Sequence, residues 1–143
     1  MEERYQLFQG DCLEVMDKLI EDGVKVDCIL TDPPYGTTYC KWDTVIVFEE
    51  MWKRINLLIE DNGAIILFAS QPFTTKLINS NIKHFKYELI WDKTFGRQPQ
   101  LSNIQPMKQH ENIVLFEKQV KKNKILSTKR KTRKTLLFKW CRK

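Results

Sequence analysis

The stretch Val26-Asp27-Cys28-Ile29-Leu30-Thr31-Asp32-Pro33-Pro34-Tyr35 decides how the rest of the chain is interpreted. Its first six residues are mainly apolar and predict a buried strand. The two prolines that follow can continue neither a helix nor a sheet ladder, because each has a fixed φ and lacks a backbone N–H. We therefore expect the chain to leave a sheet after Asp32 as a stiff loop.

This loop gathers hydrogen-bond acceptors beside an aromatic ring. An ionised Asp32 only accepts, and the carbonyls of Pro33 and Pro34 accept as well, so several oxygens can converge on one amino group. Tyr35 offers a flat face on which a base taken out of a duplex could stack, and Gly36 lets the chain turn away. An ordinary proline-rich turn is the alternative interpretation, and the neighbouring segments must decide between the two.

Length and composition predict one compact domain. The chain has 143 residues, 42% of them hydrophobic, which fits a globular protein. It contains no run of 18 apolar residues, and its first residues are charged with no apolar signal region behind them. These features predict a cytoplasmic protein without a membrane partner.

The cysteines and histidines do not indicate a metal site. Cys12, Cys28, Cys40 and Cys141 have no C-x-x-C spacing, and the two histidines lie far apart in the sequence. We expect free structural thiols, with Cys28 facing the core from its strand.

The net charge of +6 is divided unevenly. Residues 1–118 carry 13 Lys and Arg against 18 Asp and Glu, a net of −5, whereas residues 119–143 carry 11 Lys and Arg and no acid. This divides the chain into an acidic body, residues 1–118, and a basic tail, residues 119–143. A basic arm gains affinity for nucleic acid by releasing counterions, so the tail favours such a partner.

The hydrophobic periodicity predicts alternating strands and helices. A short strand is expected over residues 4–9, a helix from its N-cap Asp11 to Gly23, and a strand over residues 26–31, which makes a parallel strand–helix–strand unit with a right-handed crossover. After a polar and aromatic loop at residues 37–44, a second helix is expected over 45–60, with Trp52 in the core.

The second half of the body continues this pattern. Residues 64–69 are continuously apolar, which is typical of a parallel strand covered on both faces, and a helix is expected over 70–81. Residues 85–93 and 112–117 predict an antiparallel pair of strands at one edge, joined by a long loop over 94–111. The tail predicts a basic helix or, equally, a poorly ordered arm.

Several motifs in this order resemble the amino-methyltransferases of DNA from bacteria and phages, in the permuted form in which the catalytic motif comes first. The resemblance covers residues 4–118. The matching motifs are Gly10-Asp11-Cys12-Leu13-Glu14-Val15-Met16, Asp32-Pro33-Pro34-Tyr35-Gly36, Phe68-Ala69-Ser70-Gln71-Pro72-Phe73, Trp91-Asp92-Lys93 and His110-Glu111-Asn112-Ile113-Val114-Leu115-Phe116.

The resemblance implies a site-specific DNA methyltransferase that transfers a methyl group from S-adenosylmethionine to the exocyclic amine of a flipped base in double-stranded DNA. Asp32, Pro33, Pro34 and Tyr35 would be the catalytic residues. An aspartate at the first position resembles the adenine-specific pattern more than the cytosine N4 pattern, in which serine is common.

Other site residues also follow from the resemblance. Asp11, with Cys12 beside it, matches a family position near the adenine of the cofactor, and a simple helix cap is an equal alternative for Asp11. Lys93 and Arg97 lie where DNA could pass, and a structural role is the alternative for Lys93.

The resemblance implies an α/β fold: a partial Rossmann-like methyltransferase sheet, mostly parallel with an antiparallel edge pair, that lacks the C-terminal cofactor-binding strands. The family's F-x-G-x-G strand has no counterpart, since no glycine follows Lys118.

Three hypotheses remain open for this chain. The first is a truncated or frame-shifted methyltransferase of doubtful activity alone. The second is an inactive DNA-binding or accessory subunit whose basic tail grips phosphate while a complementing chain supplies the cofactor half. The third is methylation of another amine or amide, such as a protein glutamine.

Overall fold

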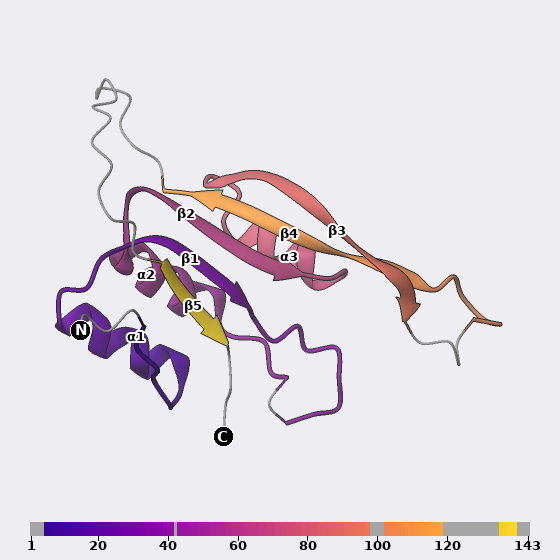
Figure 1. Ribbon diagram of the computed structural model, residues 1–143, viewed down its shortest axis with the longest axis horizontal. Helices are drawn as coiled ribbons and strands as arrows, with labels where there is room; N and C mark the ends of the chain where they lie inside the picture. The colour runs from indigo at the N-terminus through magenta and orange to yellow at the C-terminus, as the bar shows by residue number, and fades with distance from the viewer. Residues whose placement is uncertain (1–4, 42, 98–101, 119–134, 140–143) are drawn as a thin grey trace.

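The computed structural model describes residues 5–41, 43–97, 102–118 and 135–139. Within these ranges a five-stranded mixed sheet has the order β3-β4-β2-β1-β5 (Figure 1). The elements are α1 (Cys12–Glu21), β1 (Val26–Asp32), α2 (Phe48–Leu58), β2 (Ile59–Ala69), α3 (Phe73–Ser80), β3 (Phe85–Arg97), β4 (Lys108–Glu117) and β5 (Thr135–Lys139).

The centre of the sheet is parallel and one edge is antiparallel. β1 pairs in parallel with β2 on one side and with β5 on the other, and α2 connects β1 to β2. β4 runs antiparallel to β2, and β3 runs antiparallel to β4. The predicted antiparallel edge pair is therefore confirmed.

The first helix begins and ends where its capping signals predict. The side chain of Asp11 accepts from the backbone N–H of Leu13 at 2.9 Å, which satisfies one of the unpaired donors of the first turn. After Asp22, Gly23 adopts a φ of +68°, a left-handed conformation that glycine adopts without steric cost.

The strand expected over residues 4–9 is wrong for the described part, because residues 5–9 form no strand. Their apolar side chains lie in solvent: Tyr5 is 76% exposed, Leu7 89% and Phe8 53%. Alternating apolar residues favour a strand only where a neighbouring strand completes the ladder of hydrogen bonds. No described strand lies alongside them, since β5 ends the sheet on that side.

The basic tail contains a strand that the sequence did not predict. Residues 135–139 form β5, whereas a helix or a poorly ordered arm was expected, and residues 119–134 and 140–143 lie outside the described residues. β5 takes the position beside β1 where a gap was expected. Leu136 packs against the core, so apolar burial at this position outweighs the surrounding positive charge.

The boundary between α2 and β2 also differs from the expectation. The helix ends at Leu58, and the turn signal Asp61-Asn62-Gly63 lies inside β2. Val26 pairs with Ile59 but Cys28 pairs with Ala64, so the extra residues of β2 form an irregularity of the ladder. Asn62 adopts a φ of +88° there, which explains why a turn-forming residue stands inside a strand.

The helices cover one face of the sheet. α1 packs on α2 and α2 on α3, and Figure 1 shows α2 and α3 behind the sheet. The strand residues facing this layer, such as Ile29, Leu67 and Val114, are fully buried. Their neighbours on the opposite face are less buried, so the expectation that residues 64–69 are covered on both faces is wrong within the described ranges. Cys28 also lies on the less covered face and does not face the main core.

Candidate active site

The predicted motif lies at the carboxyl edge of the parallel strands. β1 ends at Asp32, and the chain continues through Pro33 and Pro34 into a loop. The N-terminus of α1 and the end of β2 reach the same edge, because α1 runs opposite to β1 while β2 runs parallel to it (Figure 1). Ligands of open α/β sheets bind at this edge.

Asp32 and Tyr35 form one hydrogen-bonded unit. Tyr35 Oη donates to Asp32 Oδ1 at 2.5 Å, and Asp32 is exposed. Burial raises the pKa of Tyr35, and the hydrogen bond to Asp32 raises it further, so the phenol keeps its proton and remains a donor. A carboxylate has two oxygens, so Asp32 can accept from Tyr35 through Oδ1 and from a guest amine through Oδ2.

The Tyr35 ring is placed by the helix that follows β2. Tyr35 is half-buried and stacks on Phe73 with ring centroids 5.1 Å apart and an interplanar angle of 29°. Phe73 is the first residue of α3 and is buried. One face of Tyr35 is thus taken by the protein, and a base could stack on the opposite face alone.

Asp43 holds the loop after the motif, a role that the sequence did not reveal. Its carboxylate accepts from the backbone N–H groups of Gly36 at 2.8 Å, Thr37 at 2.9 Å and Thr38 at 2.7 Å, and from Thr38 Oγ1 at 2.8 Å. Burial opposes ionisation of Asp43, but these donors outweigh it and hold its pKa below the usual range. A carboxylate several residues after a glycine turn is a weak sequence signal, because only the folded loop brings the donors together.

Lys93 is engaged in an ion pair. Its ammonium group contacts Glu111, and the two side chains are only 11% and 21% exposed. Lys93 Nζ also lies 5.0 Å from the centroid of the Trp91 ring. The negative charge of Glu111 contributes to the raised pKa of Tyr35. The structural alternative for Lys93 is therefore observed, and this ion pair lies within electrostatic reach of the Asp32 loop.

Arg97 lies at the end of β3, where it pairs with Lys108 at the start of β4. Its predicted role in binding DNA remains a prediction.

Asp11 and Cys12 lie at the N-terminus of α1. Asp11 Oδ1 carries the helix cap, and Cys12 Sγ lies 3.8 Å from that oxygen. The helix cap that was one of the two interpretations of Asp11 is thus present. Cys12 is buried, with 8% of its surface exposed.

The described residues do not complete a cradle for S-adenosylmethionine. Such a cradle needs a close backbone approach beside the central strand, which glycine permits. The described neighbour of β1 on that side is β5, and the sequence has no glycine after Gly96. The chain thus presents the acceptor side of a methyl-transfer site without a complete donor side.

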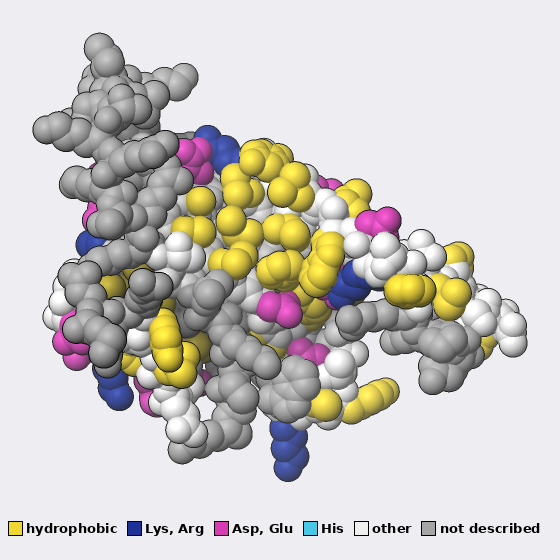
Figure 2. Space-filling model, viewed as in Figure 1, with side chains coloured by type: hydrophobic (Ala, Val, Ile, Leu, Met, Phe, Trp, Pro, Cys, Tyr) yellow, Lys and Arg dark blue, Asp and Glu magenta, His cyan; other side chains and the backbone are white. Residues whose placement is uncertain are grey.

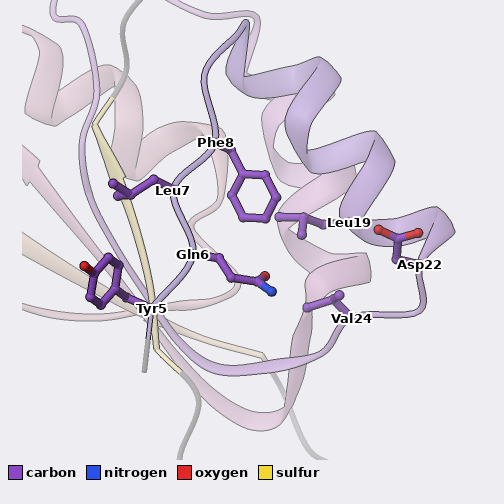
Figure 3. Close-up of a pocket in the computed structure, with 7 residues that line it drawn as sticks. All are labelled: Tyr5, Gln6, Leu7, Phe8, Leu19, Asp22 and Val24. Carbon is purple, nitrogen blue, oxygen red and sulfur yellow. The ribbon is translucent and has the colours of Figure 1, made fainter. Parts of the chain in front are cut away.

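A separate hollow lies at the opposite end of β1. Figure 3 shows that it is lined by Tyr5, Gln6, Leu7, Phe8, Leu19, Asp22 and Val24. Val24 comes just before β1, and Asp32 is its last residue, so the strand of seven residues separates the two places by about 20 Å. This hollow is therefore not the place where Asp32 would meet a guest.

The remaining predictions concern metals, thiols and Trp52. Among the described residues no group of His, Cys, Asp and Glu is arranged to hold a metal ion. Cys12, Cys28 and Cys40 are free thiols, and Cys141 lies outside the described residues. Trp52 is in the core as predicted, edge-on to Phe116 at 4.8 Å. None of the helices in the described ranges is long and apolar enough to cross a lipid bilayer.

Two solved structures share this fold. M1.HpyAVI in complex with SAM is 21% identical, with a TM-score of 0.63 over 94% of this chain and 65% of that chain. TTHA0409 from Thermus thermophilus, described as a DNA modification methylase, is 19% identical, with a TM-score of 0.55 over 82% of this chain and 54% of its own. At these identities the likeness concerns the fold.

A curated relative is named "Putative ribosomal RNA large subunit methyltransferase MJ1653", from Methanocaldococcus jannaschii. It is 28% identical over 94 residues, which are 62% of this chain and 24% of the relative. The chain thus spans about a quarter of that protein and about two thirds of M1.HpyAVI.

The family described as DNA methylase, with N6 and N4 amino-methylating members, matches residues 26–140. The match contains the Asp32-Pro33-Pro34-Tyr35 motif and all five strands. It also runs past residue 118, where the sequence placed a boundary, into the basic tail. The chain therefore belongs to the N6/N4 DNA methylase family.

Proposed function

We propose that this chain carries the amine-binding half of an adenine-directed DNA methyltransferase that uses S-adenosylmethionine. The observation that carries the proposal is the exposed Asp32 carboxylate, oriented by Tyr35 at the carboxyl end of β1. Family membership supports a DNA substrate and this methyl donor. Adenine is preferred because Asp32 stands at the first position of the motif.

The chemistry of the guest explains the residues. The lone pair of an exocyclic amine is delocalised into its ring, which makes the nitrogen planar and a poor nucleophile. Acceptors at Asp32 Oδ2 and the carbonyl of Pro33 would bind the two N–H groups and favour a more tetrahedral nitrogen. The stiffness of Pro33 and Pro34 would keep these acceptors in place before the guest arrives.

A binding experiment tests the amine site without requiring catalysis. Deoxyadenosine and purine deoxyriboside, which lacks the exocyclic amine, are titrated into the full chain and followed by ligand-observed NMR. We expect deoxyadenosine to bind more tightly, and Asp32→Ala to abolish that difference. Tyr39→Ala is the control, because Tyr39 is fully exposed on the following loop. Equal binding of both nucleosides to the wild-type chain would refute the proposed role of Asp32.

The reaction product tests base specificity. Plasmid DNA is incubated with the chain and radiolabelled S-adenosylmethionine, and its nucleosides are separated by chromatography. We expect the label in N6-methyldeoxyadenosine. Label in N4-methyldeoxycytidine would overturn the adenine assignment, while label in RNA under matched conditions would favour a substrate of the kind that the curated relative's name states.

An accessory DNA-binding subunit is the second candidate, favoured by the eleven basic residues and absence of acids in 119–143. Deleting the tail would also remove β5, so the sharper variant replaces the Lys and Arg of residues 121–134 with Gln. If these residues neutralise phosphates, the slope of the salt dependence of duplex binding should flatten by about 0.9 for each phosphate that is no longer neutralised. Unchanged salt dependence would exclude this role for the tail.

A further inference from the structure

One face of the sheet is apolar and carries no helix among the described residues. We call it the open sheet face. Strand pairing places directly opposite residues on the same face, and the fully buried partners define the helix-covered side. The open sheet face consists of Leu30, Ile66, Phe68, Ile113, Leu115, Tyr87, Leu89 and Trp91.

These side chains form a continuous surface. Tyr87 and Leu89 are each 52% exposed and Trp91 is 47% exposed. Trp91 packs edge-on against Phe68, with ring centroids 5.7 Å apart. Figure 2 shows hydrophobic side chains gathered over β2, β4 and β3 on the side facing the viewer. An exposed apolar patch that spans three strands marks a contact surface.

The strand sequences themselves require a cover on this face. β2 is apolar at every position from Ala64 to Ala69, including Ile66 and Phe68, which face away from the helices. Parallel strands with this pattern are buried on both faces, because their crossover connections place helices there. In this chain α1, α2 and α3 all pack on one side of the sheet.

We propose that the open sheet face docks a helical segment from the remainder of a methylase fold, supplied by a polypeptide outside these 143 residues. The chain aligns over 94% of its length with M1.HpyAVI but covers 65% of that chain, so about a third of that fold has no counterpart here. A doubly wound sheet has helices on both faces, and the described helices account for one of them.

The chemistry of the face favours a helix over a nucleic acid. Its centre is aliphatic, with Ile66, Leu89, Ile113 and Leu115, and the nearby Lys93 is already paired with Glu111. A strand of phosphates would find no unpaired cation among these residues. An amphipathic helix would bury the aliphatic centre and keep its polar side in water.

The experiment uses the full chain co-produced with the part of M1.HpyAVI that has no counterpart here. We expect a 1:1 complex by size-exclusion chromatography with light scattering. Leu89→Asp should weaken it about tenfold or more, since it places a charge in the apolar contact. Ile90→Asp is the matched control: Ile90 is the next residue of β3, is 66% exposed, and pairs with Asn112 on the other face.

Each outcome decides the matter. No complex, or a complex equally sensitive to Leu89→Asp and Ile90→Asp, would overturn the proposal. So would a Leu89-dependent homodimer, which would make a second copy the occupant, or Leu89-dependent binding of single-stranded DNA by the chain alone. Asp32→Ala, which tests amine binding, should leave the complex intact, so failure of the docking surface and failure of the proposed function, on which this inference rests, remain distinguishable.

Discussion

Replacing Asp43 with alanine should release the loop that follows the Asp32 motif. Asp43 is 7% exposed, and its carboxylate receives four hydrogen bonds of 2.7 to 2.9 Å from Gly36, Thr37 and Thr38. Three of the donors are backbone N–H groups that would lose their partner at once. Because Tyr35 directly precedes this loop, its position should become less defined as well.

The magnitude follows from these bonds. A hydrogen bond to a charged group contributes about 1.5–3 kcal/mol, but water can reach the exposed residues 36–38 once the carboxylate is gone and recover part of it. We therefore expect Asp43→Ala to lower the free energy of unfolding by about 3 kcal/mol. Asp43→Asn keeps one acceptor oxygen without the charge and should lose about half as much.

Urea unfolding followed by circular dichroism measures the change in stability, and amide hydrogen exchange locates it. We expect the N–H groups of Gly36, Thr37 and Thr38 to exchange faster in Asp43→Ala, while the amides of β2 keep their relative protection. Glu60→Gln is the control, because it removes an exposed carboxylate elsewhere on the surface. Unchanged exchange at residues 36–38, with stability within about 0.5 kcal/mol of the wild type, would refute this account of Asp43.

The pH dependence provides an independent check on the same carboxylate. The pKa of Asp43 is lowered in the folded state, so its contribution is fully present above the unfolded value of about 4 and is lost as the pH falls through the folded pKa. Wild-type stability should therefore drop more steeply below about pH 4 than that of Asp43→Ala. Parallel acid unfolding curves would contradict the assignment.

Three further predictions concern Gly36, Arg54 and Tyr35. Gly36→Ala should cost about 1–2 kcal/mol in urea unfolding, because Gly36 has a φ of +68° and a Cβ would lie 2.8 Å from Val45 Cγ2; an unchanged midpoint would contradict it. Arg54→Lys should lower the thermal unfolding midpoint, since lysine cannot reproduce the two parallel bonds from Nε and Nη2 to Asp17 that join α2 to α1; its hydrogen bonds with Arg54 lower the pKa of Asp17, so the difference between Arg54→Lys and wild type should shrink on acidification below about pH 4, and a constant difference would argue against the ion pair. Tyr35→Phe should leave the tyrosinate absorbance step near pH 10 unchanged, because burial and the bond to Asp32 keep this phenol protonated there; a smaller step in the variant would show that Tyr35 titrates normally.

The sequence by itself determined the features that depend on neighbouring residues. The strand ending at Asp32, the stiff exit through Pro33 and Pro34, the turn at Gly36 and the cap at Asp11 were all predictable, because φ restrictions, missing donors and capping act within a few positions along the chain. The antiparallel pair of β3 and β4 followed from two alternating runs with no helix between them.

The tertiary structure decided everything that depends on which strands meet. Residues 5–9 have strand-like alternation but no neighbouring strand among the described residues, whereas residues 135–139 lie in a highly charged segment and still form β5, because a place beside β1 buries Leu136. The same holds for Asp43 beneath the loop, Tyr35 against Phe73, and the pairing of Lys93 with Glu111. Such contacts join positions that are not neighbours in the chain, and their free energy depends on burial and geometry that no local pattern encodes.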